Sequence, residues 1–343
     1  MNPLIDLRSD TVTKPTPAML EVMFQAPVGD DVYGEDPTVN ELQAYCAELF
    51  GMEAGLFCPS GTMTNQIAIK VHTQPLSEVI CDRTSHIYYY EGGGIAFNSS
   101  ASVHLVDGVR GKMTPQQVEA GIKPDNIHFP ETMLVSLENT SNKGGGSYYT
   151  IDEIAAISEV CQCYHLPLHL DGARVFNALV AAGEPPQSYG RYFDSISVCL
   201  SKGLGTPVGS VLLGSKAFVE RAKRVRKVLG GGWRQAGYLA AAGLYALKNN
   251  VERLKDDHAR ATRIGKALEQ APYVTEVMPV ETNIVIFRLQ DQVNTDAFLA
   301  YLQEKDIYAT SFGPQQIRFV THLDIQEAMV TAIEEALAAF QVK

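Results

Sequence analysis

Two ionisable residues follow short apolar segments of this chain, and their combination indicates a cofactor chemistry. Residues 166–170 are an apolar segment that suits a buried strand and leads to Asp171. Residues 196–200 are another, and they lead to Lys202. Ligands of open α/β sheets bind at the carboxyl ends of strands. A lysine placed there can form a Schiff base with pyridoxal phosphate (PLP), and a carboxylate can keep its pyridinium nitrogen protonated, so the two residues predict a PLP site.

A binding site for the PLP phosphate is predicted at the start of a helix. The segment Cys58-Pro-Ser-Gly-Thr-Met-Thr-Asn65 lies between a predicted strand and a predicted helix. Ser60, Gly61 and Thr62 leave backbone N–H groups and the positive end of the helix dipole free for an anion. Serine and threonine at such positions are more often plain helix N-caps. Together with the acid and the lysine, however, this helix start becomes a natural phosphate site.

One histidine is placed to stack on a planar ring. His86 follows the apolar segment 79–81 and lies within Thr84-Ser-His-Ile-Tyr-Tyr-Tyr-Glu91. It can stack on a cofactor or cap a turn at the surface, and its position alone leaves both interpretations open. The chain has no complete GxGxxG pattern and no GxSxG, so neither a dinucleotide cofactor nor a serine nucleophile is indicated.

Composition limits the remaining classes of function. With 343 residues, 45% of them hydrophobic, the chain can bury a large core and form two domains. A net charge of −11 argues against nucleic-acid partners and anionic membranes. The apolar segment 238–247 is far shorter than the roughly 20 residues that span a bilayer. The six cysteines form no CxxC pair and no HExxH is present, which favours reduced thiols in a cytoplasmic protein and no dedicated metal site.

The order of the predicted elements favours an α/β fold with two parts. Strands and helices alternate up to about residue 214, which indicates a mostly parallel sheet covered by helices on both faces. A long helical region follows over residues 215–270 and is broken at 230–232. Beyond residue 271, strands alternate with two helices, as in a small α+β unit. The boundary is expected between residues 250 and 260.

Six segments of the chain resemble the threonine aldolases: Asp6-Leu-Arg-Ser-Asp-Thr-Val-Thr13, Val28-Gly-Asp-Asp-Val-Tyr-Gly-Glu-Asp-Pro37, Pro59-Ser-Gly-Thr-Met-Thr-Asn65, Leu137-Glu-Asn-Thr140, Leu168-His-Leu-Asp-Gly-Ala-Arg174 and Leu200-Ser-Lys-Gly-Leu-Gly205. The resemblance extends to Arg318-Phe-Val-Thr-His322. It implies PLP-dependent fold type I, like aspartate aminotransferase, with a mostly parallel seven-stranded sheet and a small C-terminal α+β domain. The expected division is an N-terminal segment, 1–15, associated with the small domain, a large PLP-binding domain, 16–255, and a small domain, 256–343.

The resemblance also implies a role for each matching residue. Lys202 matches the Schiff-base lysine, and Asp171 matches the partner of the pyridine nitrogen. His86 matches the ring-stacking histidine, and the phosphate positions are matched by Ser60, Gly61 and Thr62. The substrate carboxylate is expected to bind Ser9, Arg174 and Arg318, with Arg174 also close to the cofactor, because the planar fork of arginine pairs with a carboxylate.

Four further matches concern the substrate or a neighbouring subunit. His128 matches a second histidine near the β-hydroxyl group of the substrate. Tyr33 lies on an arm that in the family reaches into the site of a neighbouring subunit. Lys227 and Arg234 match basic residues that also serve the neighbour's site, where Lys227 is expected to contact substrate and Arg234 to contact cofactor.

The activity implied by the resemblance is the reversible retro-aldol cleavage of L-threonine, L-allo-threonine and related β-hydroxy-α-amino acids to glycine and an aldehyde. A cytoplasmic homotetramer with shared active sites is expected. The base that takes the β-hydroxyl proton is left open between His86, His128 and an ordered water. The preferred β-carbon configuration and a structural cation are left open too. Alternative functions are a β-eliminating lyase, an aminotransferase and a PLP-binding homologue without catalysis.

Overall fold

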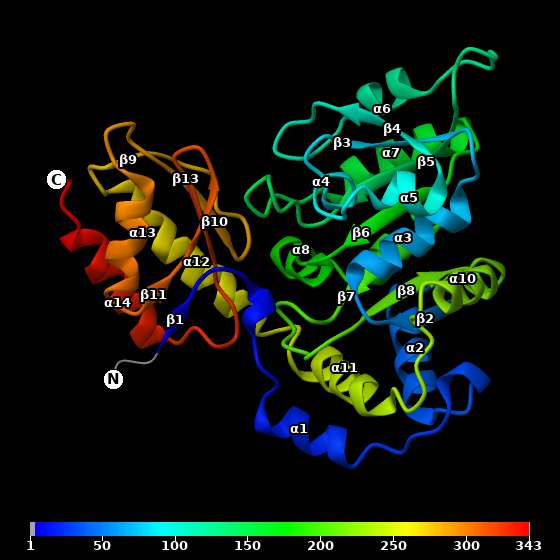
Figure 1. The fold of residues 1–343 in the computed structure, drawn as a ribbon, viewed down its shortest axis with the longest axis horizontal. Helices are drawn as coiled ribbons and strands as arrows, with labels where there is room; N and C mark the ends of the chain where they lie inside the picture. Colours follow the sequence, from blue (N-terminus) through cyan, green and yellow to red (C-terminus); the bar gives the residue numbers. More distant parts are fainter. Residues whose placement is uncertain (1–3, 343) are drawn as a thin grey trace.

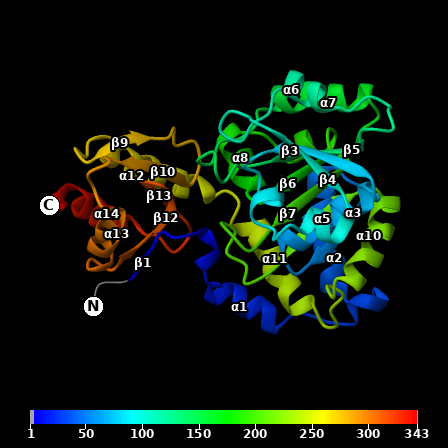
Figure 2. The same ribbon diagram turned by 45° about the horizontal axis from the view of Figure 1, so that its top comes forward.

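The computed structural model describes residues 4–342, so residues 1–3 of the expected N-terminal segment and Lys343 of the expected small domain lie outside the described residues. A large α/β part and a smaller part lie side by side (Figures 1 and 2). None of the helices within residues 4–342 is long and apolar enough to cross a membrane.

The large part is built on a seven-stranded sheet, as predicted. Across the sheet the strands are β2 (Ala54–Cys58), β8 (Ser210–Gly214), β7 (Ser195–Cys199), β6 (Leu168–Gly172), β5 (Glu131–Glu138), β3 (Ser77–Asp82) and β4 (Ser102–Val106). Among them, β8 runs in the opposite direction to the other six strands. The prediction of a mostly parallel sheet is therefore confirmed, and the carboxyl ends of β6 and β7 lie next to each other.

Helices cover both faces of this sheet because its strands are apolar on both sides. Alternate residues of a strand point to opposite faces. In β2, Leu56 packs with α3 (Gly61–His72) and α10 (Lys216–Val228), whereas Phe57 belongs to the core on the other face. That larger core includes residues of α2 (Pro37–Phe50), α7 (Ile151–Cys163), α8 (Val175–Ala182) and α11 (Gly237–Asn249). Helix α1 (Pro17–Phe24) packs along α11.

The smaller part has its own four-stranded antiparallel sheet and its own core. Its strands, in spatial order, are β12 (Thr310–Gly313), β13 (Gln316–Val320), β10 (Ile284–Leu289) and β9 (Val274–Val277). The helices α12 (Leu254–Glu269), α13 (Thr295–Gln303) and α14 (Glu327–Ala339) contribute to its core. Near the N-terminus, β1 (Ile5–Asp6) pairs in parallel with β11 (Ile307–Tyr308). The domain limits 1–15, 16–255 and 256–343 stay a prediction.

The helical region 215–270 contains a second break that the sequence did not predict. Helix α11 ends at Asn249 and α12 begins at Leu254. Between them the buried Asn250 side chain donates to the carbonyl of Leu204 at 2.8 Å. This contact ties the turn to the loop that carries Lys202, so the break helps to hold the predicted site in place.

Several short helices were not predicted either. They are α4 (His86–Tyr89), α5 (Gly94–Ser99), α6 (Pro115–Gly121), α8 and α9 (Gln187–Gly190), and two 3₁₀ turns, η1 (Asp10–Val12) and η2 (Asp31–Tyr33), accompany them. Elements of three to eight residues are too short for the apolar spacing of a helix to show in the sequence.

Candidate active site

A cavity of about 190 Å³ lies at the carboxyl ends of β6 and β7. The structure brings together there six of the residues predicted for the site: Ser60, Gly61, Thr62, His86, Asp171 and Lys202. Asn65 and Glu91 line the same cavity and were not predicted. The cavity therefore combines a lysine, a carboxylate, an imidazole and a helix start on one small surface.

The start of α3 is a suitable place for the phosphate of PLP. The Ser60 hydroxyl accepts the N–H of Met63 at 3.2 Å, so this serine is also an N-cap. The N–H groups of Gly61 and Thr62 are in the first turn, where a helix offers them no partner. Across from them, the buried Ser210 hydroxyl has no hydrogen-bond partner among the described residues, and a Cβ built on Gly61 would come within 3.6 Å of it. The unpaired N–H groups, with an unpaired hydroxyl close to Gly61, fit an anionic group.

The Asp171 carboxylate is held firmly at the wall of the cavity. One of its oxygens accepts the side-chain amide of Asn65 at 2.9 Å, and the other accepts the N–H of Ala173 at 3.1 Å. The same Asn65 amide donates to Glu91 at 3.0 Å, and its oxygen contacts His169 at 3.2 Å. Because Asn65 lies four residues after Gly61, its side chain is on the same face of α3, one turn further on.

His86 opens α4 and is fixed at its backbone and at its ring. Its N–H donates to the Glu138 carboxylate at 2.8 Å, and its Nδ1 lies 3.0 Å from Glu91. Burial alone lowers the pKa of the His86 imidazole, but the hydrogen bond to Glu91 and the charges of Asp171 and Glu91 outweigh it, so the net shift of the pKa is upward. Ligand atoms of His86, Glu91 and Asp171 lie within 4.8 Å of one another, an arrangement that could also hold a metal ion.

Replacing Glu91 with glutamine is expected to lower the pKa of His86, because the neutral amide keeps the side-chain shape but removes the charge that raises this pKa. Below its raised pKa the wild-type imidazole is protonated, so the variant should lose that proton at a lower pH. NMR titration of labelled histidine in both proteins measures the shift. Glu78→Gln, a change at a buried glutamate of β3, serves as the control. An unchanged His86 titration in the Glu91 variant would contradict the expected coupling.

The two predicted substrate-binding arginines are oriented by other residues. The Nε and Nη2 atoms of Arg174 both donate to Asp10, each at 2.7 Å, and both side chains are buried. Arg318 donates from Nη1 to Asn142 at 2.7 Å and from Nη2 to the carbonyl of Arg8 at 2.8 Å. The buried Nε of Arg318 has no partner among the described residues. Each guanidinium thus keeps N–H groups that a substrate carboxylate could use.

Asp10 was not predicted, although Ser9 beside it was. The Ser9 hydroxyl accepts the N–H of Thr11 at 3.2 Å, as the N-cap of η1. Burial alone raises the pKa of the Asp10 carboxyl, but the Arg174 guanidinium, helped by Lys202 and His322, outweighs it and lowers this pKa to about 2. Asp10 is therefore an ionised carboxylate that pairs with the predicted substrate arginine and is also stabilised by the charge of the predicted catalytic lysine.

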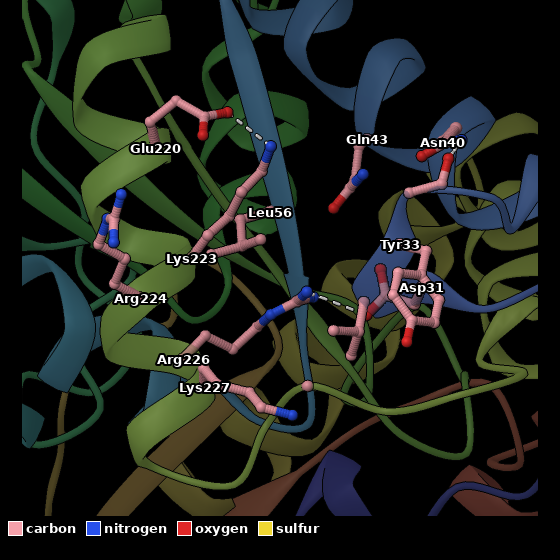
Figure 3. Close-up of a pocket in the computed structure, with 13 residues that line it drawn as sticks. Asp31, Tyr33, Asn40, Gln43, Leu56, Glu220, Lys223, Arg224, Arg226 and Lys227 are labelled. Carbon is pink, nitrogen blue, oxygen red and sulfur yellow. Dashed lines mark hydrogen bonds and ion pairs between the residues drawn. The ribbon is translucent and has the colours of Figure 1, made fainter.

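Three predicted residues do not line this cavity but gather on another surface. Tyr33 and Lys227 line a cavity of about 590 Å³ between η2 and α10 (Figure 3). Tyr33 is 75% exposed, and Arg234 is largely exposed and pairs with Asp30 at 2.8 Å. Arg226, also from α10, reaches the buried Asp31 at 3.0 Å and so fixes this arm to the helix.

His128 is not brought to the cavity of its own chain. It is exposed and lies in the loop before β5, whereas Glu138 at the other end of β5 pairs in register with Asp171. The seven residue steps along β5 correspond to roughly 23 Å at about 3.3 Å per residue. The expected role of His128 near the substrate therefore requires a different subunit, and it stays a prediction.

Comparison with known proteins identifies the class that this fold and cavity define. A family model described as beta-eliminating lyase matches residues 6–292, so the chain belongs to that family. Within it, the chain belongs to the low-specificity L-threonine aldolases. It is 44% identical to the low specificity L-threonine aldolase of Escherichia coli K12, over 98% of this chain and 99% of that protein. It is 40% identical to low-specificity L-threonine aldolase 1 of Arabidopsis thaliana, over 98% and 95% of the two chains.

A solved structure supports the fold independently. Leishmania major threonine aldolase superposes with a TM-score of 0.85, covering 97% of this chain and 98% of that one at 22% identity. The predicted fold type I is confirmed by this likeness together with the family match.

Proposed function

We propose that this protein binds PLP in the cavity at β6 and β7 and cleaves L-threonine, L-allo-threonine and related β-hydroxy-α-amino acids to glycine and an aldehyde. The observation that carries the proposal is the convergence of Lys202, Asp171, His86 and the start of α3 on one cavity. Relatives named as threonine aldolases support this reaction over the other reactions of PLP enzymes.

The side chains around the cavity fit the cofactor in number and in chemistry. Lys202 would hold its aldehyde carbon covalently, and the N–H groups of Gly61 and Thr62 with the Ser210 hydroxyl would bind its phosphate. His86 would stack on its ring. When bound, PLP supplies a ring that accepts the electron pair of a breaking Cα–Cβ bond.

Asp171 would keep a proton on the ring nitrogen. A buried carboxylate beside a pyridine favours the protonated, cationic form of that ring. The two hydrogen bonds from Asn65 and Ala173 fix the carboxylate so that it faces one way. Loss of this carboxylate would therefore weaken the ring as an electron acceptor.

Arg174 and Arg318 would bind the substrate carboxylate together with Ser9. Two guanidinium groups with fixed orientation can hold a carboxylate in one place, which sets the direction of the bond to be broken. When the Nδ1 of His86 donates to Glu91, its Nε2 is left as an acceptor for the β-hydroxyl proton. A contribution from His128 would come from another subunit.

A direct test combines cofactor absorbance with product analysis. The purified protein, loaded with PLP, should release equal amounts of glycine and acetaldehyde from L-threonine or L-allo-threonine without any keto-acid acceptor. Cleavage only when a keto acid is supplied would indicate an aminotransferase, and ammonia with a keto acid would indicate elimination. A bound cofactor without turnover of any β-hydroxy amino acid would contradict the proposed activity.

We also propose a cytoplasmic homotetramer in which Tyr33, Lys227 and Arg234 complete the active site of a neighbouring subunit. All three side chains are exposed, and none of them lines the Lys202 cavity of its own chain, which supports this arrangement. Six cysteines without a disulfide, all within the described residues, agree with a reducing compartment.

Mixing two inactive variants should then restore activity. Lys202→Ala damages the site of the subunit that carries the change, whereas Lys227→Ala damages the site of the neighbouring subunit. In a hybrid pair both changes therefore fall on the same site, and the other site is intact. After equal mixing with subunit exchange, roughly a quarter of the wild-type activity is expected, because half of the pairs are hybrids with one intact site of two. A mixture of Lys202→Ala with Asp171→Asn is the control, since both changes affect the same site. Equal failure of both mixtures would place Lys227 outside the neighbour's site.

A further inference from the structure

Glu138 is a buried carboxylate at the end of β5, directly beside Asp171 in the register of the sheet. Both of its oxygens are occupied by backbone donors from two different loops. Oε2 accepts the N–H of His86 at 2.8 Å, and Oε1 accepts the N–H of Asn142 at 2.9 Å. One side chain thus fixes the residue expected to stack on the cofactor and the loop that follows β5.

Asn142 extends this connection to the smaller part of the molecule. Its side-chain oxygen accepts Nη1 of Arg318, from β13, at 2.7 Å. The second nitrogen, Nη2, is held by the carbonyl of Arg8. Each of these two nitrogens carries a second N–H, and the buried Nε has no partner among the described residues. The orientation of the remaining N–H groups of Arg318 therefore depends on Asn142, and the position of Asn142 depends on Glu138.

A carboxylate is a costly choice at this position. Burial, followed by the charge of Asp171, raises the pKa of Glu138 to about 7, against the opposing effect of the N–H groups of Asn142 and His86. Two buried carboxylates on neighbouring strand ends oppose each other, and an apolar or amide side chain would relieve that repulsion. A glutamine has only one acceptor oxygen, however, and could satisfy only one of the two N–H groups.

We propose that Glu138 is a positioning residue that aligns two parts of the active site at once: His86 against the cofactor, and Arg318, through Asn142, against the substrate carboxylate. The inference rests on the proposed function. It assigns to Glu138 no contact with substrate or cofactor, and it accounts for a two-acceptor side chain between the two loops.

Two variants separate the effect of Glu138 on His86 from its effect on Arg318. Glu138→Gln leaves one N–H without an acceptor, so it should change the circular dichroism of bound PLP and raise the Kd for glycine, measured by cofactor absorbance, by roughly 10-fold to 100-fold. In Asn142→Ala the backbone N–H of position 142 still donates to Glu138, and only the side-chain contact to Arg318 is lost. It should raise the Kd for glycine similarly while the circular dichroism of the cofactor stays as in the wild type.

The double variant adds a test of the shared path. Because both changes act on Arg318 through the same contacts, their effects on the Kd for glycine should be less than additive. Glu78→Gln, at the far end of the neighbouring strand β3, is the matched control and should change neither readout.

The outcomes distinguish this inference from the proposed function. If the wild type cleaves threonine while a folded Glu138→Gln protein keeps the wild-type Kd and cofactor spectrum, Glu138 has no positioning role and only the inference fails. If Glu138→Gln changes only the melting temperature, Glu138 has a structural role alone and the inference fails as well. Should Glu138→Gln not fold, Asn142→Ala decides alone, and an unchanged Kd for glycine in that variant overturns the inference.

Discussion

Replacing Lys202 with alanine is expected to abolish the visible absorbance of bound PLP and to slow threonine cleavage by roughly four to six orders of magnitude, as removal of a covalent catalytic group does in other enzymes. The effect should come from the side chain alone. The Lys202 backbone carbonyl accepts the N–H of Gly205 at 2.8 Å and the hydroxyl of Thr13 at 3.3 Å, and alanine retains both contacts. The loop is therefore expected to keep its shape.

The measurement is an absorbance spectrum of the purified variant with added PLP, together with the rate of acetaldehyde release. Lys266→Ala is a suitable control, because Lys266 is an exposed lysine of α12 in the smaller part. That variant should keep the wild-type spectrum and rate. Retention of the wild-type absorbance band in Lys202→Ala would show that another lysine holds the cofactor.

The centre of the candidate site could be predicted because it depends on short-range features. Asp171 and Lys202 follow consecutive apolar segments, and consecutive parallel strands are usually neighbours in a sheet. The helix start at Gly61 was recognisable from its small and hydroxyl-bearing residues. The distance of His128 from this site could have been inferred from strand direction, although it was not: His128 precedes β5, whereas Asp171 lies near the carboxyl end of the neighbouring parallel strand β6.

The residues that orient the site could not be predicted in this way. Asp10 and Arg174 are 164 positions apart, and Asn142 and Arg318 are 176 apart. Their pairing depends on how the two parts of the molecule pack, which no local pattern records. In the sequence, Glu138 appears only as part of the motif Leu137-Glu-Asn-Thr140, and its role could not be predicted. Its two backbone contacts come from loops whose shape the spacing of apolar residues does not determine.

Replacing Asp10 with asparagine is expected to lower the free energy of unfolding by about 3–5 kcal/mol, because it leaves the buried Arg174 guanidinium without its counter-charge. Substrate binding should weaken as well, since the same two hydrogen bonds set the direction in which Arg174 presents its remaining N–H groups. We expect the KM for threonine to rise by roughly 10-fold or more. Asp107→Asn is the matched control: Asp107 also pairs through two hydrogen bonds with an arginine, Arg83, but both are exposed.

The dependence on pH separates the ion pair from a mere packing contact. The pKa of Asp10 is lowered to about 2, from an ordinary value of 3.8, so its ionised form stabilises the fold above pH 3.8, and this contribution is lost as the pH falls toward 2. The difference in unfolding free energy between wild type and Asp10→Asn should therefore be largest at neutral pH and shrink between pH 4 and pH 2. Urea unfolding at several pH values measures it, and the exposed control should change stability by at most about 1 kcal/mol throughout. A difference that stays constant down to pH 2 would mean that the charge of Asp10 contributes nothing, and that Arg174 is oriented by shape alone.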